Sequence, residues 1–258
     1  MSSQRPSPAV LRAFGAQGQP APLAGGRGTS WAAGDLVFKP DDGPAPAWLA
    51  SVVPDGFRLA APVTTRDGDL VHDGWTATRW VAGSSPDYSQ VDTWRAILAA
   101  GRAFHRAVAD LPRPDDLDTR HDRWALADRV AWGERTTRFH PAFAGLAARL
   151  RAALRPLGPA QIVHGDLSGN VLFAPGLPPA VIDVSTYWRP PAYAEGVVIA
   201  DALCWHDAPA SLWRRLEVPA TAVARALLFR MATTNELVDA DFDDEARRYD
   251  RAATALGL

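Results

Sequence analysis

Cysteine and lysine are almost absent from this chain of 258 residues, which contains one of each, Cys204 and Lys39. A single cysteine cannot form an intramolecular disulfide, so the sequence excludes a disulfide-stapled domain. Long apolar runs are also missing, because no window offers the roughly 18 uninterrupted apolar residues of a membrane-spanning helix. The first residues lack the apolar core of a signal peptide. We therefore expect a cytoplasmic protein that has no membrane partner.

A strong net charge of either sign is lacking as well. The 27 basic and 29 acidic residues give a net charge of −2 at pH 7, so no global basic field collects nucleic acid or anionic lipid. We expect no nucleic acid partner. With 47% hydrophobic and 22% charged residues, the composition can bury a sizeable core and excludes a wholly disordered chain. The length predicts one domain or two closely joined lobes.

The scarcity of lysine is unusual because arginine is abundant. Of the 27 basic residues one is Lys39, and the other 26 are arginines. Codon bias toward arginine explains the 26, but it does not explain why one position keeps an ammonium group. Lysine differs from arginine wherever a compact point charge must reach into a site. Lys39 is therefore a candidate site residue, and an accident of codon usage is the alternative.

Two kinds of pattern divide the chain. In the first third, glycine, proline and Asp-Gly turns separate short extended segments, which predict strands at residues 35–40, 57–61, 69–72 and 75–80. After a break at residues 83–86, apolar residues recur at helical spacing and predict helices at 90–111, 142–157, 194–207, 219–238 and 243–256. Short apolar strands at 171–173 and 180–183 flank a Pro-Gly turn. The sequence thus predicts an α+β fold with a β-rich lobe, residues 1–82, and a larger helical lobe, residues 83–258.

Polar side chains concentrate in the segment His164-Gly165-Asp166-Leu167-Ser168-Gly169-Asn170, between two apolar segments. Asp183 follows at the end of the second hairpin strand. Oxygen ligands of this kind suit Mg²⁺, which proteins hold by one or two carboxylates together with water and substrate phosphates. Asp166 would then orient or deprotonate a hydroxyl group. The alternative is a set of turn and cap residues, which Asp and Asn also favour.

A glycine-rich stretch lies upstream of the strand that carries Lys39. Its glycines Gly25, Gly26 and Gly28 are typical of a loop whose backbone approaches phosphates closely. Taken in order, this stretch, Lys39, the His164-Gly165-Asp166 motif, Asn170 and Asp183 resemble the aminoglycoside phosphotransferase and choline-kinase-like family, a branch of the protein-kinase-like fold. The resemblance covers nearly the whole chain, and its motifs are specific only in combination.

The resemblance implies a two-lobe fold, with a small antiparallel β-rich lobe before a larger helical lobe. The run from Val181 to Pro191 is also similar to a narrower, actinobacterial-type subfamily of phosphotransferase-like proteins, which brings no known substrate. The resemblance to the larger family implies an ATP-dependent kinase that moves the γ-phosphate of ATP to a hydroxyl of a small-molecule acceptor, with ATP and Mg²⁺ as cofactors.

The roles of single residues also follow from the resemblance. Asp166 would accept or orient the hydroxyl proton, Asn170 and Asp183 would hold Mg²⁺, and Lys39 would bind the nucleotide phosphates. Gly25, Gly26 and Gly28 would lie over those phosphates, and the adenine would bind backbone groups of Trp80, Val81 and Ala82. The acceptor site would come from residues 84–160 and 194–258. His164 is not expected to act as the base, and Asp201, within an apolar run, would brace the loop.

The sequence departs from the family pattern in two places. Asn170 follows Asp166 by four residues where related kinases have five, and no glutamate follows the lysine strand. A lysine ammonium needs a counter-charge to stay positioned, and Asp41, Asp42 and Asp183 are the candidates. These departures leave open a catalytically inactive kinase-fold module that binds nucleotide or regulates. Transfer of a nucleotidyl group onto a protein is a third interpretation.

Overall fold

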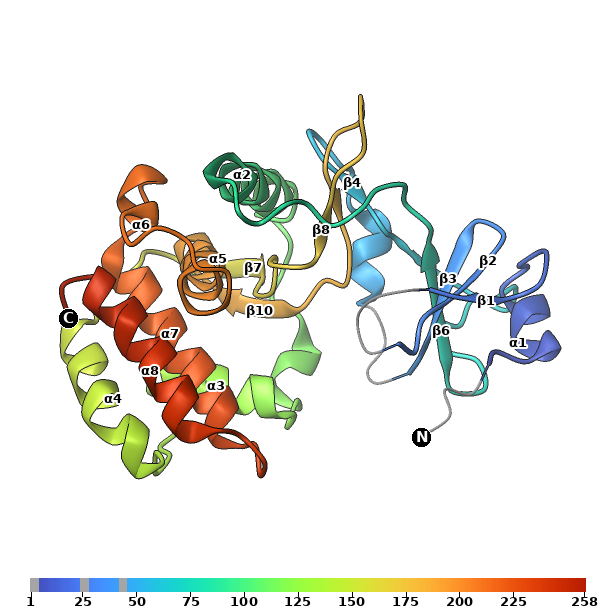
Figure 1. Ribbon diagram of the computed structural model, residues 1–258. Coiled ribbons are helices and arrows are strands. Elements are labelled where there is room, and N and C mark those ends of the chain that lie inside the picture. The colour runs from blue at the N-terminus through green and yellow to red at the C-terminus, as the bar shows by residue number, and fades with distance from the viewer. Residues whose placement is uncertain (1–4, 24–27, 42–45) are drawn as a thin grey trace. The chain divides into compact units, whose positions relative to one another are not determined.

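The structure is a computed structural model that describes residues 5–23, 28–41 and 46–258 (Figure 1). The chain divides into two compact units. The first unit contains Met1–Ser84 and Leu172–Asp183, and the second contains Ser85–Val171 and Val184–Leu258. Within the described residues, no helix has both the length and the apolar character needed to cross a membrane.

Antiparallel strands dominate the first unit. A five-stranded sheet has the order β1-β2-β3-β6-β5, and every neighbouring pair in it is antiparallel. The elements are α1 (Pro8–Ala13), β1 (Ala21–Pro22), β2 (Trp31–Ala33), β3 (Leu36–Pro40), the 3-10 helix η1 (Ala47–Ser51), β4 (Arg58–Leu59), β5 (Pro62–Val63), β6 (Trp75–Arg79) and β9 (Ala180–Val181). One further strand, β8 (Val171–Leu172), starts at the last residue of a second-unit segment.

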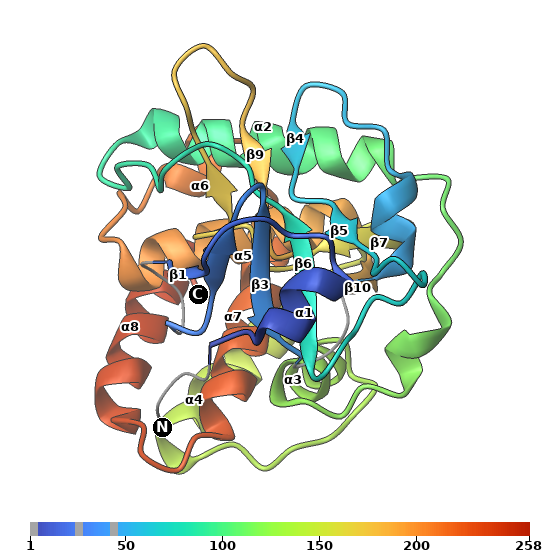
Figure 2. The same ribbon diagram turned by 90° about the vertical axis from the view of Figure 1, so that its right-hand side faces the viewer.

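One face of the five-stranded sheet packs against α1, as Figure 2 shows. Phe38 of β3 is fully buried there and meets the ring of Phe14 edge-on, with the ring centroids 5.7 Å apart. The α1 helix begins behind Ser7, whose side chain accepts a hydrogen bond from the N–H of Val10, an ordinary N-cap. Because side chains alternate along a strand, Lys39 falls on the opposite face of the sheet from Phe38.

The predicted strands at 35–40 and 75–80 are confirmed as β3 and β6, whereas the strand at 57–61 shortens to β4. The predicted strand at 69–72 is wrong. Only His72 pairs, through an isolated bridge to Trp75 around a turn of Asp73 and Gly74, both with positive φ. Residues 69–71 do not pair with β6, because β3 pairs with one side of that strand and β5 pairs with the other side from Ala77 onward.

A second group of strands brings residues 172–183 into the first unit. β4 runs parallel to β9, with Arg58 opposite Ala180, and the three-stranded sheet has the order β4-β9-β8. The guanidinium of Arg58 also donates to the carbonyl of Pro178 at 2.8 Å. These contacts fix the end of β9, two residues before Asp183, in the same unit as Lys39.

The second unit is helical apart from one pair of strands. Its elements are α2 (Val91–Ala107), the 3-10 helix η2 (Asp115–Asp118), α3 (Arg123–Ala131), α4 (Pro141–Ala153), β7 (Gln161–His164), β10 (Thr186–Arg189), α5 (Pro191–Trp205), α6 (Leu212–Arg215), α7 (Ala220–Asn235) and α8 (Phe242–Ala255). The five predicted helices are confirmed as α2, α4, α5, α7 and α8 with shifted ends. The short helices α1, α3 and α6 are not predicted by the sequence. The sheet and the helices together confirm the α+β class.

Helix α7 is central to the second unit and contacts α3, α4, α5 and α8 (Figure 1). Gly196 lets α5 approach α7 closely, because a Cβ atom at this position would lie 2.4 Å from the carbonyl oxygen of Ala222. β7 and β10 form an antiparallel pair in which His164 lies opposite Thr186. The loop at residues 165–170 therefore leaves the end of β7 beside buried helices.

Candidate active site

His164, at the end of β7, holds the loop at residues 165–170 in place. Its side chain is fully buried, and its Nδ1 accepts hydrogen bonds from the backbone N–H groups of Asp166 (3.1 Å) and Ser185 (3.4 Å). The backbone N–H of His164 donates to Nε2 of His105 at 3.1 Å. Burial and the nearby His164 lower the pKa of His105 from 6.5 to about 3, so this imidazole is neutral near pH 7. His164 thus holds the loop backbone, as expected of a residue that is not the base.

Asn170 folds back onto Asp166 despite the shortened loop. Its Nδ2 donates to the backbone carbonyl of Asp166 at 2.7 Å and to the Oδ2 atom of Asp166 at 3.2 Å. A turn in which the N–H of Asn170 donates to the carbonyl of Leu167, with Gly169 at a φ of +84°, makes this possible. The spacing of four residues therefore still brings the two polar side chains together.

Two glycines allow the loop to pack tightly. A Cβ atom on Gly165 would lie 2.4 Å from Cδ2 of Tyr187, so the tyrosine ring rests directly on the loop backbone. A Cβ atom on Gly101 in α2 would lie 2.4 Å from a methyl group of Leu167, which is buried. Real Cβ contacts essentially never come under 3.0 Å. Packing therefore favours glycine at both positions and fixes where Asp166 projects.

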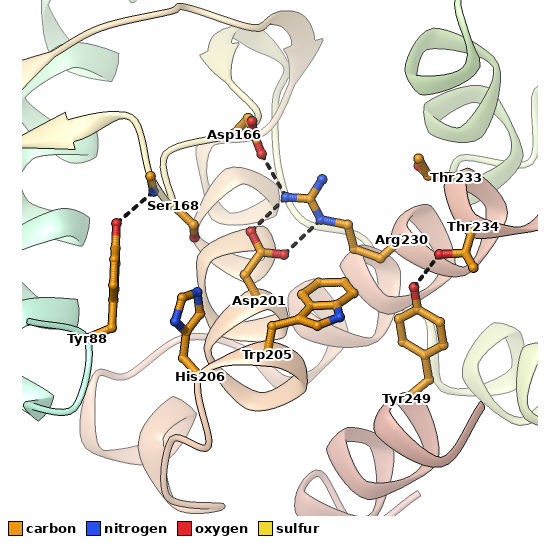
Figure 3. A pocket seen from close by; sticks show the side chains of 11 residues that line it. Tyr88, Asp166, Ser168, Asp201, Trp205, His206, Arg230, Thr233, Thr234 and Tyr249 are labelled. Carbon is orange, nitrogen blue, oxygen red and sulfur yellow. Dashed lines mark hydrogen bonds and ion pairs between the residues drawn. The ribbon is translucent and has the colours of Figure 1, made fainter. Parts of the chain in front are cut away.

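Arg230 of α7 connects Asp166 to Asp201 (Figure 3). Its Nη2 donates to Oδ1 of Asp166 at 2.8 Å, and its Nε and Nη2 donate to the two oxygens of Asp201 at 2.8 and 2.7 Å. Burial lowers the pKa of Arg230, but the carboxylates of Asp201 and Asp166 outweigh that effect and raise it well above its ordinary value. Asp201 therefore braces the loop, as predicted, but it does so through an arginine.

A cavity of about 370 Å³ lies beside Asp166 (Figure 3), within the size range of small-ligand sites. All of its lining residues belong to the second unit: Tyr88, Asp166, Ser168, Gly169, Asp201, Trp205, His206, Arg230, Thr233, Thr234 and Tyr249. The hydroxyl oxygen of Tyr88 accepts a hydrogen bond from the N–H of Gly169 at 3.0 Å. The Tyr88 ring also contacts the ring of His206, with centroids 4.5 Å apart. Aromatic rings and hydroxyl groups thus surround the carboxylate.

Lys39 forms an ion pair with Asp183, and both carboxylate oxygens of Asp183 take part. Both residues lie in the first unit. Their side chains are 34% and 45% exposed, so a ligand can reach this pair. Of the three carboxylates that the sequence left open as the counter-charge of Lys39, the structure pairs Asp183 with it. Asp42 lies outside the described residues.

The other residues predicted for nucleotide binding are only partly described. Gly25 and Gly26 lie outside the described residues, whereas Gly28 is described and has a φ of +70°. The stretch connects β1 to β2, which pair antiparallel. Trp80 follows β6, its N–H donates to the carbonyl of Asp35, and half of its side chain is exposed. Residues 81 and 82 are half-buried.

The donors available for Mg²⁺ are hard oxygen atoms. Within residues 5–23, 28–41 and 46–258, no group of three or more His, Cys, Asp and Glu side chains could hold a metal ion. Mg²⁺ does not need such a group, since one or two protein ligands with water and phosphate suffice. Asp183 offers a carboxylate, and the Nδ2 bonds of Asn170 leave its amide oxygen as an available ligand atom. The donor chemistry at these two residues therefore fits Mg²⁺.

The sequence analysis missed Arg230 and Tyr88. Arg230 carried a signal, because it is a charge within the apolar run Leu227-Leu228-Phe229-Arg230-Met231. The same reasoning had identified Asp201. Tyr88 carried none, since a tyrosine in a connection of glycine, serine and proline resembles any surface aromatic residue.

Solved structures with this fold include an aminoglycoside phosphotransferase from Alicyclobacillus acidocaldarius. It has 19% sequence identity and a TM-score of 0.56, over 99% of this chain and 95% of that chain. A spectinomycin phosphotransferase, in complex with ADP and spectinomycin, has 11% identity and a TM-score of 0.55, over 97% and 96% of the two chains. A choline/ethanolamine kinase family protein from Mesorhizobium loti has 19% identity and a TM-score of 0.54, over 98% and 92%. The fold is therefore that of the kinase-like small-molecule phosphotransferases.

A family model described as the phosphotransferase enzyme family matches residues 37–193, which is more than half of the chain. The matched segment includes Lys39, the loop at 164–170 and Asp183. The chain belongs to this phosphotransferase family, which confirms the predicted resemblance. A search of curated proteins gives no match. The actinobacterial-type subfamily stays a prediction.

Proposed function

We propose that the protein is an ATP-dependent phosphotransferase that transfers the γ-phosphate of ATP to a hydroxyl group of a small-molecule acceptor. The setting of Asp166 carries this proposal. Asn170 and Arg230 each hold one of its carboxylate oxygens, and it lines a cavity of about 370 Å³. Phosphoryl transfer is catalysed mainly by positioning and charge neutralisation. A fixed carboxylate beside a ligand-sized cavity suits the task of orienting a hydroxyl group.

In this proposal Lys39 binds the nucleotide phosphates, while Asp183 and Asn170 would hold Mg²⁺. Bound Mg²⁺ neutralises charge on the phosphates. Lys39 and Asp183 balance each other in the structure. A phosphate group can replace Asp183 as the partner of Lys39, and a divalent cation can replace Lys39 as the partner of Asp183. The exposed pair is therefore suited to receive a nucleotide together with its metal ion.

The adenine is assigned to the segment after β6. Among the described residues, no backbone carbonyl accepts from the N–H groups of Val81 and Ala82, and such groups can bind a base. Trp80 offers a half-exposed ring next to them. Gly25, Gly26 and Gly28 are assigned to the loop over the phosphates, because glycine allows a backbone to approach an anion closely.

The acceptor is assigned to the cavity beside Asp166. Its lining residues lie at 88 and between 166 and 249, largely within the segments expected to bind the acceptor. The similar spectinomycin phosphotransferase is solved with spectinomycin bound, and by analogy we expect a hydroxylated small molecule here. The aromatic rings of Tyr88 and Trp205 favour an acceptor with an apolar face.

A nucleotide-turnover screen against pools of small-molecule metabolites tests the proposal. Asp166→Asn is expected to lower turnover by about 10²- to 10⁴-fold, the usual contribution of a positioned acid or base. Asp92→Asn is a matched control, because this carboxylate is 94% exposed, and it should keep wild-type turnover. No turnover with any pool, or full activity of Asp166→Asn, would overturn the proposal.

Calorimetry separates the enzyme from an inactive nucleotide-binding module. The enzyme requires Mg²⁺-dependent ATP binding that Asp183→Ala abolishes, together with turnover. Binding without turnover would identify the module. The mass of the product distinguishes phosphoryl transfer from nucleotidyl transfer, because the two groups add different masses.

A further inference from the structure

Arg230 joins a buried ion pair to the candidate catalytic carboxylate. One nitrogen atom, Nη2, donates to both Asp166 (2.8 Å) and Asp201 (2.7 Å), and Nε gives Asp201 a second bond at 2.8 Å. The exposed fractions of the side chains are 14% for Arg230, 6% for Asp201 and 40% for Asp166. Asp166 is therefore the most accessible of the three residues, although all three line the cavity (Figure 3).

We propose that Arg230 is a positioning residue, which fixes the carboxylate of Asp166 for the acceptor hydroxyl and is itself fixed by Asp201. The inference rests on the proposed function, because the orientation of Asp166 matters for a reaction only if Asp166 meets the acceptor. Arg230 acts through Asp166 and needs no contact with the reacting atoms.

Asp201 explains why an arginine can be held at this depth. A buried charge is costly unless it is paired and its hydrogen bonds are satisfied. The planar guanidinium fork meets the carboxylate of Asp201 with two parallel bonds, which sets the plane of the guanidinium as well as its position. A lysine in the same place would present a point charge without a fixed plane. The direction in which Nη2 points toward Asp166 is therefore determined by Asp201.

The contacts to Asp166 orient its carboxylate without saturating it. Arg230 takes Oδ1 and Asn170 takes Oδ2, so the carboxylate is held from two sides and cannot rotate without losing a bond. An ionised carboxylate has about four lone-pair sites on its two oxygens. Two protein bonds therefore leave acceptor capacity for a substrate hydroxyl.

A purely structural ion pair would not require the third contact. Arg230 and Asp201 already satisfy each other by a bidentate bond, and Asp166 is exposed enough to be solvated by water. The extra bond from Nη2 instead holds the loop. His164 and Tyr88 bind backbone N–H groups of the loop, and Arg230 adds a bond to the Asp166 side chain.

The decisive variant is Asp201→Asn combined with Arg230→Gln. Removing both charges together avoids an unpaired buried charge, which is the strongly destabilising outcome, and it deletes the cation beside Asp166. We expect kcat to fall by about 10- to 100-fold, as for a misplaced reacting group, while KM for ATP and for the acceptor stays within about threefold. The single variant Arg230→Lys keeps the charge but not the planar guanidinium, so its kcat should lie between those of the double variant and the wild type.

Arg225→Gln is the matched control. Arg225 is another buried arginine of α7, but its guanidinium donates to the carbonyl of Ala131. After circular dichroism has verified that the Arg225→Gln protein is folded, its kcat should equal that of the wild type. A folded double variant with full kcat, or a double variant that changes KM alone, would overturn the positioning role. If Asp166→Asn is inactive in the same assay, the proposed function stands and only this inference fails.

A measurement without activity tests the contact itself. In a double-mutant cycle, Asp166→Asn is combined with the Asp201→Asn/Arg230→Gln background, and the unfolding equilibrium constants are compared. Groups in direct contact should be non-additive by a factor of about two or more. Additive effects would refute the inference even if the wild type transfers no phosphate. Coupling without any turnover would refute the proposed function and, with it, the role of Arg230 in the reaction, and would leave only the contact between Arg230 and Asp166.

Discussion

Replacement of Gly165 by alanine tests whether packing, rather than backbone conformation, requires glycine between His164 and Asp166. The added Cβ atom would lie 2.4 Å from Cδ2 and 2.5 Å from Cε2 of Tyr187, whereas ordinary contacts begin at 3.4 Å. The ring or the loop must therefore move by about 1 Å to restore normal contact.

The ring of Tyr187 has little room to move. Its side chain is buried at 6% exposure, it meets the ring of Phe229 edge-on at 6.0 Å, and the guanidinium of Arg120 lies 5.4 Å from its centroid. The loop must therefore take up part of the shift, and Asp166 moves with it. Overpacking of this kind costs about 1–3 kcal/mol, and displacement of a reacting group by about 1 Å costs about 100-fold in rate.

Thermal unfolding and turnover are the two assays for Gly165→Ala. At about 2–4 °C per kcal/mol for a chain of this size, we expect Tm to fall by about 2–12 °C. Gly145→Ala is the control, because Gly145 lies in α4 and nothing lies within 4 Å of an added Cβ atom. The free energy of unfolding of that variant should rise by up to about 1 kcal/mol, since alanine is the better helix former. A Gly165→Ala protein as stable and active as the wild type would refute the packing argument.

Three further predictions concern other positions. Lys39→Arg keeps the charge but should lower nucleotide turnover by about tenfold or more. Turnover equal to that of the wild type would mean that Lys39 is an accident of codon usage and not a site residue. His105 has a folded pKa of about 3 against 6.5 unfolded, so the unfolded chain binds the extra proton below pH 6.5. Stability should therefore fall by about 1.4 kcal/mol per pH unit from pH 6.5 toward pH 3, and urea titrations should show a weaker fall in His105→Gln. Gly196→Ala should destabilise by about 1–3 kcal/mol in the same titrations, because its Cβ atom meets backbone at Ala222; an unchanged midpoint would contradict the close approach of α5 and α7.

The family and the α+β fold could be predicted because their signals are local in sequence. Asp166 and Asn170 lie on one turn, so their spacing alone brings them together, and the turn from Leu167 to Asn170 accommodates the shorter loop. The long helices repeat their apolar pattern over several turns. The predicted strand at 69–72 failed because strand pairing depends on which edges are free, and no local pattern reports that.

Arg230 could not be assigned to the site from sequence because it lies 64 residues after Asp166. Its position inside an apolar run indicates burial and hence a carboxylate partner, but the chain has 29 acidic residues. Only the packing of α7 against α5 selects Asp201 as that partner, and only the loop adds Asp166. Burial of a charge is therefore predictable from sequence, whereas the identity of its partner requires the tertiary structure.

The same limit applied to Lys39, and here the structure changes how the sequence is interpreted. Asp183 lies 144 residues away, and it reaches the first unit only because β9 pairs with β4. The glutamate missing after the lysine strand favoured an inactive module, since an ammonium without a counter-charge is poorly positioned. Asp183 supplies that counter-charge, so the missing glutamate is not by itself an argument against activity. The consequence is that Asp183 has two assigned partners, Lys39 and Mg²⁺. In the absence of Mg²⁺, loss of its carboxylate should therefore not weaken nucleotide binding, because it frees Lys39 for the phosphates, whereas in the presence of Mg²⁺ the same change should abolish the Mg²⁺-dependent binding.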